Sequence, residues 1–281
     1  MSEESGTATP HQMHDRTQRP EGRLNSSIAH FVFVVGLLMI IAMDPTAALC
    51  TTVGFERVSI PQTDGPPLEG AFWYPSSTPE KLMTVGFAQQ RVAVDGAIAG
   101  RQFPLVVFSH GALGSWEGNL DTAVALARAG IVSAALTYDR SPHDDVMKIA
   151  NHGSQLSALI SFALHGWRGH TAIDPNKIGA FGFSLGAFTV LTVAGGRPDL
   201  NRIAPHCRLA ASEWSCAVAR GHLDIAEDPP PIINWVRDPR IKAVVIAAPA
   251  LGYLFGKQGL KDVTMPVQLW QASPDFSQRV F

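Results

Sequence analysis

Charged residues and cysteine are scarce in this sequence. Only 16% of its 281 residues are Asp, Glu, Lys or Arg, and the formal net charge is -2. This balance gives no electrostatic reason to expect binding to nucleic acid. The histidines are scattered, and neither H-E-x-x-H nor C-x-x-C occurs. We therefore predict no metal site and no cofactor.

Cysteine occurs at only three positions, and two of these form a close pair. Beyond Cys50, only Cys207 and Cys216 remain. In an oxidising compartment these two residues can form a disulfide that contributes on the order of 2–3 kcal/mol. Two buried free thiols are the alternative.

The first fifty residues have the pattern of a targeting segment. A polar stretch with three arginines precedes the apolar run 31–43, and small residues follow at 46–48. The run is shorter than the roughly 20 residues that span a membrane, and it suits the core of a secretory signal. We interpret residues 1–50 as a signal peptide of a periplasmic or secreted protein. The alternative is an uncleaved anchor, through which alone the chain would contact a membrane.

The remaining residues, 51–281, alternate between strand and helix patterns. This order predicts an α/β fold with a mostly parallel, doubly wound sheet. Strands 54–60 and 68–74 are expected to form an antiparallel hairpin at the sheet edge, and residues 75–102 to form a loop. The other strands are expected at 103–108, 131–138, 177–182, 241–248 and 267–271, and helices at 117–129, 144–167 and 185–194. The proline-rich segment 196–240 interrupts this alternation and is interpreted as a cap insertion, with a plain surface excursion as the alternative.

One motif indicates a catalytic residue. Residues 182–186 read G-F-S-L-G, between an apolar strand and an apolar helix. This context places Ser184 on a sharp strand-to-helix turn, with its hydroxyl exposed above the sheet. Gly182 and Gly186 let the strand and the helix approach each other closely. We predict that Ser184 is a nucleophile; a glycine-rich turn without catalytic function is the alternative.

A serine nucleophile needs oxyanion donors, an acid and a base. We expect the donors to be the N–H groups of Leu185 and of Ala112, which lies in the glycine-containing loop 109–114. Asp275, after the last predicted strand, is the candidate acid, with a surface turn residue as the alternative. We interpret His110 as a residue that shapes its loop, in preference to a base. No histidine follows Asp275.

Four segments together resemble bacterial α/β-hydrolases related to dienelactone hydrolase and platelet-activating-factor acetylhydrolase. They are A-F-W-Y-P at 71–75, F-S-H-G at 108–111, the motif at 182–186, and D-P-R-I-K-A at 238–243. The resemblance covers about residues 53–275. It implies an α/β-hydrolase fold and a serine esterase that cleaves a small ester or lactone through an acyl-enzyme. It also implies Ser184 as nucleophile, Asp275 as acid, and Ala112 and Leu185 as oxyanion donors.

The sequence departs from this family at its end. The histidine segment has no counterpart, and the last strand and helix are expected to be missing. A shortened gene product explains this; the alternative is a histidine recruited from elsewhere, His110 or His143. Loss of the base lowers turnover on the order of 10⁶-fold, so we expect an impaired enzyme. The alternative function is a catalytically silent homologue that binds a ligand or partner.

Overall fold

A single nine-stranded sheet forms the centre of the molecule. The computed structural model describes residues 52–62, 65–139, 146–213, 215–216 and 233–271. The strand order is β3-β4-β1-β2-β6-β5-β7-β8-β9. The strands are β1 Thr52–Ile60, β2 Leu68–Ser76, β3 Lys81–Val85, β4 Ala88–Val94, β5 Phe103–Ser109, β6 Val132–Leu136, β7 Ile173–Phe183, β8 Ile241–Ala247 and β9 Val267–Trp270.

The second half of the sheet is parallel. Strands β6, β5, β7, β8 and β9 pair side by side in the same direction, and β2 joins them antiparallel to β6. Strands buried on both faces read as continuous apolar runs, as the sequence of β5 does. The parallel arrangement brings the carboxyl ends of β5, β6, β7 and β8 to one edge of the sheet. The predicted mostly parallel sheet is confirmed.

The start of the domain differs from expectation in two ways. The predicted antiparallel hairpin forms as β1 and β2, but β4 and β3 extend the sheet beyond it, so it is not at the edge. Residues 75–102, expected to be a loop, contain the β3–β4 hairpin, which turns at Gly86 with φ of 60°. Four of the five residues of β3 are exposed. Its sequence, K-L-M-T-V, also lacks the strict alternation of apolar and polar residues by which a strand is recognised.

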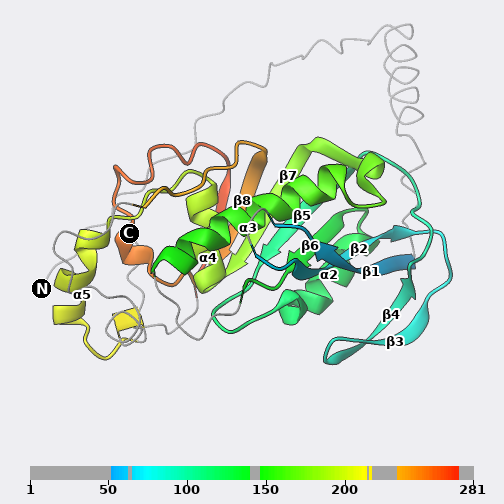
Figure 1. Ribbon diagram of the computed structural model, residues 1–281, viewed down its shortest axis with the longest axis horizontal. Coiled ribbons are helices and arrows are strands. Elements are labelled where there is room, and N and C mark those ends of the chain that lie inside the picture. The colour runs from blue at the N-terminus through cyan, green and yellow to red at the C-terminus, as the bar shows by residue number, and fades with distance from the viewer. Residues whose placement is uncertain (1–51, 63–64, 140–145, 214, 217–232, 272–281) are drawn as a thin grey trace, which may run out of the picture. The chain divides into compact units, whose positions relative to one another are not determined.

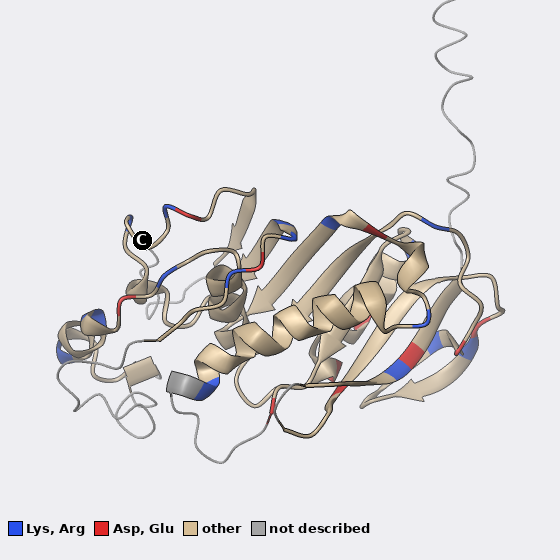
Figure 2. Cartoon of the chain, turned by 45° about the horizontal axis from the view of Figure 1, so that its top comes forward, with Lys and Arg blue, Asp and Glu red and all other residues tan. Residues whose placement is uncertain are grey.

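Helices cover the sheet on both faces (Figure 1). Helices α3 (Val146–His165) and α4 (Leu185–Val193) pack on one face, and α2 (Leu120–Arg128) packs on the other. Figure 2 shows α3 almost without charge along its length, and Lys148 is its only Lys, Arg, Asp or Glu. The short helices are η1 Trp116–Asn119, η2 His170–Ala172, η3 Leu200–Arg202, α5 Ile203–Leu209 and η4 Gly252–Leu254. No helix in the described ranges is both long and apolar enough to cross a membrane.

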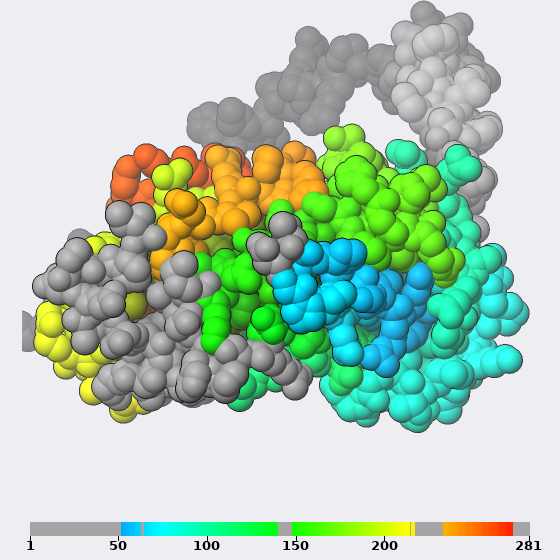
Figure 3. Space-filling view, in the orientation of Figure 1, coloured from blue at the N-terminus to red at the C-terminus, as the bar shows by residue number. Residues whose placement is uncertain are grey.

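A hydrogen-bond network around the buried carboxylate of Asp238 joins α3 to the start of β8. The carboxylate of Asp238, 2% exposed, accepts hydrogen bonds from Arg240 Nε at 2.8 Å and from Ser157 Oγ at 2.8 Å. Arg240 also donates to Ser161 Oγ at 3.0 Å, so four side chains form one network. Figure 3 shows the orange part of the chain, which includes residues 233–247, lying directly against the green part that includes α3. This network gives the D-P-R segment a structural role.

The network makes stability depend on pH. Burial acts to raise the pKa of Asp238, but the hydrogen bonds from Arg240 and Ser157 outweigh it and hold the pKa below its usual value. A depressed pKa stabilises the fold above the unfolded value of about 4, and the contribution is lost as pH falls through the folded pKa. We predict that Asp238→Asn lowers the free energy of unfolding by about 1–3 kcal/mol at pH 7. The difference from wild type should shrink at pH 3.

Urea unfolding of wild type and variant at pH 7 and at pH 3 measures the difference in the free energy of unfolding at each pH. Asp121→Asn, on the exposed first turn of α2, is the matched control and should differ little from wild type at either pH. A loss in Asp238→Asn that is equally large at both pH values would contradict the prediction.

Candidate active site

Ser184 joins β7 to α4 in a strained backbone conformation. Its φ is 54° and its ψ is -118°, a region that non-glycine residues seldom occupy, at a cost of about 1–3 kcal/mol. The Ser184 N–H donates to the carbonyl of Ala247 at 2.9 Å, and the Ser184 carbonyl accepts from Ala250 N–H at 3.1 Å and Ala187 N–H at 3.0 Å. Bonds from β8, from the loop after it and from α4 therefore hold the turn in place.

Two glycines allow the turn to close. A Cβ on Gly182 would overlap the backbone of Gly186, and a Cβ on Gly186 would overlap the carbonyl of Ser109 at the end of β5. The first turn of α4 therefore packs directly on the ends of two strands. The strand, sharp turn and helix predicted around residues 182–186 are all present.

The loop after β5 reaches the serine. A Cβ built on Gly111 would lie 3.4 Å from Ser184 Cβ, so the backbone of this loop lies against the turn. Ala112 packs against the apolar cluster that contains Leu185. Because Leu185 is the first residue of α4, its N–H has no acceptor within its own helix. The structure thus brings Ser184, Ala112, Leu185, Gly182 and Gly186 together.

His110 is held by main-chain groups at both ring nitrogens. Its Nδ1 lies 2.7 Å from the carbonyl of Gly111, and its Nε2 accepts a hydrogen bond from Tyr138 N–H at 3.2 Å. A carbonyl only accepts and an amide only donates, so these two partners assign a proton to Nδ1 and leave Nε2 as an acceptor. Taking up a proton at Nε2 would break the bond to Tyr138. This geometry supports the loop-shaping interpretation of His110 over a base.

Three further residues around His110 were not singled out from the sequence. Tyr138, just after β6, donates or accepts a 2.6 Å hydrogen bond with Ser109 Oγ, and burial raises its pKa well above the usual value. His152 on α3 stacks on the Tyr138 ring at 4.0 Å between centroids. Burial, and then the nearby His110, lower the pKa of His152 to about 4, so it is neutral at pH 7. The position of Tyr138 at a strand's carboxyl end is the one sequence signal that could have indicated it.

Two predicted site residues lie outside the described part of the chain. Asp275, the candidate acid, and His143, a candidate recruited base, are both in this category. Strand β9 ends at the same edge of the sheet as Ser184, and the carbonyl of Trp270 accepts a hydrogen bond from Ala248 N–H at 2.7 Å. The role of Asp275 stays a prediction.

The segment expected to form a cap contains helix α5 and a disulfide. Cys207 and Cys216 are bonded, with their Cα atoms 5.4 Å apart. His206 Nε2 lies 2.9 Å from Glu213 Oε2, and the His206 ring stacks on Tyr253 at 3.6 Å between centroids. Tyr253 belongs to η4, close in sequence to the residue whose N–H bonds the Ser184 carbonyl. The segment therefore packs on the loop that supports Ser184, and its capping role stays a prediction.

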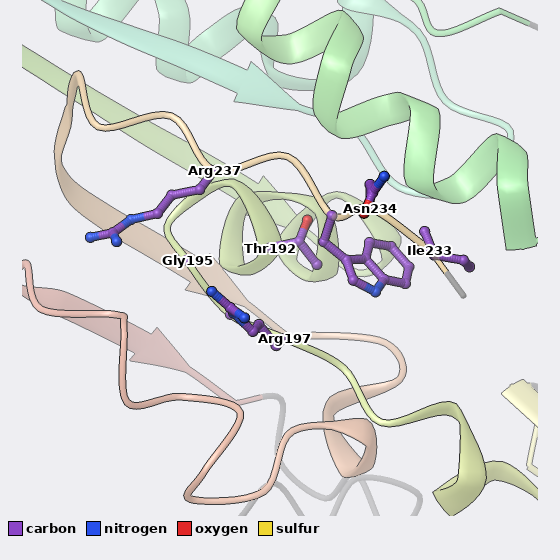
Figure 4. Close-up of a pocket in the computed structure, with 8 residues that line it drawn as sticks. Thr192, Gly195, Arg197, Ile233, Asn234 and Arg237 are labelled. Atoms are coloured by element: carbon purple, nitrogen blue, oxygen red, sulfur yellow. The ribbon is translucent and has the colours of Figure 1, made fainter. Parts of the chain in front are cut away.

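A cavity of about 270 Å³ lies at the far end of α4. Figure 4 shows Thr192 and Gly195 at the end of the helix, and Asn234 and Arg237 on the segment that leads into β8. Thr192 is eight residues beyond Ser184, or about 12 Å along the helix axis. No residue of the 182–186 turn or of the loop after β5 lines this cavity. It is separate from the candidate active site.

Within the described ranges, no group of three or more His, Cys, Asp or Glu side chains is arranged to hold a metal ion.

Comparison with solved structures defines the fold. Ferulic acid esterase from Streptomyces cinnamoneus matches with a TM-score of 0.51 and 17% identity, over 79% of this chain and 65% of that protein. A bacterial heroin esterase matches with a TM-score of 0.47 and 15% identity over 87% and 81%, and a Pyrobaculum calidifontis esterase with 0.45 and 14% over 92% and 85%. The chain has the α/β-hydrolase fold.

Sequence comparison adds nothing to this assignment. No protein-family model matches the chain, and no curated protein sequence matches it. The chain spans between about half and two thirds of the length of the first structures that it matches, at 54%, 65% and 46%.

The close packing of the turn leads to a prediction. Gly182→Ala should destabilise the protein by about 3 kcal/mol or more, because the new methyl group meets backbone atoms that cannot rotate away. Gly179→Ala is the matched control in the same strand, since a Cβ there would have its nearest atom, Ala243 O, at 3.6 Å. Thermal and urea unfolding of both variants measure the difference. Equal stability of the two variants would contradict the packing argument.

Proposed function

We propose that the chain is a serine hydrolase of the α/β-hydrolase type that cleaves a small ester or lactone through an acyl-enzyme. The observation that carries the proposal is the strained turn at Ser184, with the Gly111 backbone lying against the serine Cβ. Backbone strain of this kind persists where the surrounding structure enforces it, and it clusters at active sites. The fold shared with ferulic acid esterase is consistent with the proposal.

The proposed reaction follows from the arrangement. Ser184 Oγ attacks the carbonyl carbon, and the negative charge that develops on the carbonyl oxygen is met by the N–H groups of Ala112 and Leu185. The positive end of α4 adds to this stabilisation. The Ser184 hydroxyl proton passes to solvent water. The tetrahedral intermediate collapses with cleavage of the ester C–O bond, and the alkoxide takes a proton from water and leaves as the alcohol. A water molecule then adds to the acyl-serine, Ser184 Oγ regains a proton, and the carboxylic acid is released. Asp275 is the proposed acid that would orient a base.

The strength of the base decides how fast this reaction runs. His110 is engaged at both ring nitrogens by the backbone, so the proposal assigns it no proton transfer. We therefore propose an enzyme of low turnover, or a protein whose site binds an ester-like ligand without turning it over. These two functions differ in whether Ser184 is reactive.

A fluorophosphonate probe and a p-nitrophenyl ester distinguish the two functions. We predict that purified wild-type protein is labelled on Ser184 and hydrolyses the ester, and that Ser184→Ala loses both activities. Ser59→Ala, at an exposed position of β1, is the control and should keep both. Folded wild-type protein that is neither labelled nor active would overturn the hydrolase proposal and favour the silent binding protein.

We further propose that the protein is exported to an oxidising compartment. The bond between Cys207 and Cys216 supports this, because such bonds persist mainly outside the cytosol. Residues 1–50, which carry the targeting pattern, lie outside the described ranges.

Expression in a bacterial host tests the export proposal. We predict that the protein is recovered from the periplasmic fraction, with Cys207 and Cys216 protected from a thiol-alkylating reagent until a reductant is added. The double variant Cys207→Ser/Cys216→Ser should lose about 2–3 kcal/mol of stability under non-reducing conditions. Free thiols at both positions in freshly isolated native protein would contradict the proposal.

A further inference from the structure

The carbonyl group of Gly111 accepts two hydrogen bonds. One comes from His110 Nδ1 at 2.7 Å and the other from Gly114 N–H at 3.0 Å. A peptide unit is planar, and its carbonyl and N–H point in opposite directions. Fixing the Gly111 carbonyl therefore also fixes the direction of the Ala112 N–H. Rotation of this peptide unit would break both bonds at once.

The imidazole that makes one of these bonds is itself anchored from β6. The Tyr138 N–H donates to His110 Nε2, and the Tyr138 hydroxyl pairs with Ser109 Oγ at 2.6 Å. The ring of Tyr138 contacts two imidazoles, with 4.7 Å between its centroid and that of His110 and 4.0 Å between its centroid and that of His152. Both Ser109 and Tyr138 are buried, at 0% and 3% exposed. The loop between β5 and η1 is therefore tied to the end of the next strand.

A second hydrogen bond holds the far end of the same loop. Trp116 N–H donates to Thr137 Oγ1 at 3.1 Å, one residue before Tyr138. In sequence, Gly111 lies between His110 and Trp116, the two residues that these hydrogen bonds hold. Its backbone also lies against Ser184, since a Cβ on Gly111 would be 3.4 Å from the serine Cβ. The loop is thus fixed on both sides of the residue that faces the nucleophile.

We infer that His110 is a positioning residue that, anchored by Tyr138, locks the Gly111–Ala112 peptide so that the Ala112 N–H is presented to an oxyanion at Ser184. The inference rests on the proposed function. It gives His110 a role through its Nδ1 proton, which is distinct from a role as a base. It also predicts that the bond from Nδ1 matters more than the bond to Nε2.

Two substitutions at His110 distinguish the contributions of its two hydrogen bonds. In His110→Asn the side-chain amide occupies about the place of Nδ1 and can still donate to the Gly111 carbonyl. In His110→Gln the amide reaches about the place of Nε2 and can accept from Tyr138 N–H, but the donor to Gly111 is lost. Both variants remove the ring, so the loss of stacking is the same in each. His165→Gln, at an exposed position near the end of α3, is the control for the substitution itself.

The readouts are kcat and KM for a p-nitrophenyl ester, the rate of fluorophosphonate labelling of Ser184, and the thermal midpoint. We expect His110→Gln to lower kcat on the order of 10²-fold with KM nearly unchanged, as for loss of one oxyanion donor. We expect His110→Asn to stay within about 10-fold of wild type. A merely structural role would lower the thermal midpoint of both variants and would not separate their kcat values.

Tyr138→Phe and Ser109→Ala provide a second route should the His110 variants fail to fold. Each removes one partner of the same hydroxyl bond and should lower kcat by about 3- to 10-fold. The double variant should lose little more, because both changes break one interaction. Fully additive losses, or no loss in either, would overturn the inference.

The outcomes for the proposed function and for the inference are distinct. Wild-type protein without labelling or hydrolysis overturns the proposed function and the inference with it. Active wild-type protein in which His110→Asn and His110→Gln have equal kcat overturns the inference alone. Retained activity in His110→Gln with loss in His110→Asn would also overturn it, because the bond to Tyr138 would then be the important one.

Discussion

The candidate site depends on one strained residue held by its neighbours. Ser184 keeps a left-handed φ because its N–H and carbonyl groups are bonded to Ala247 and Ala250, which end and follow β8. The strain costs about 1–3 kcal/mol, comparable to one or two hydrogen bonds, so these contacts are sufficient to maintain it. The strand order brings these bonding partners to Ser184, because β8 is the parallel neighbour of β7. The backbone conformation of Ser184 is therefore a product of the whole sheet rather than of the local motif alone.

The common end of the parallel strands also explains how the loop after β5 is held by hydrogen bonds. Parallel strands end together, so the residues that follow β5, β6 and β7 meet in space although they are about 30 to 75 residues apart in sequence. Tyr138 after β6 anchors His110 after β5, and His110 fixes Gly111 beside Ser184 after β7. The hydroxyl bond between Ser109 and Tyr138 is buried, and the hydrogen bonds that His110 makes are partly buried. The buried bond is costly to break, because its partners have no access to water.

Sequence reasoning found the elements that carry a strong local signal and missed those that depend on tertiary contacts. The continuous apolar runs of β5 and β8 and the glycines around Ser184 predicted the parallel sheet and the turn. The β3–β4 hairpin was missed because most of β3 faces solvent and lacks an apolar face. Tyr138 and His152 were missed because a lone aromatic or histidine in an apolar stretch has no distinguishing pattern. Their role appears only when the strand ends are brought together.

The oxyanion donors that we propose stabilise charge as oriented dipoles. Burial keeps His152 neutral at pH 7, and burial keeps Tyr138 protonated. In the proposed reaction, the positive partial charges come from the N–H groups of Ala112 and Leu185 and from the start of α4. Such dipoles are already oriented and need no reorganisation when charge develops, which is the condition for effective oxyanion stabilisation. A site of this kind can bind a developing oxyanion well while its serine stays weakly nucleophilic. Stabilisation of the intermediate and activation of the nucleophile are thus separable properties of this fold.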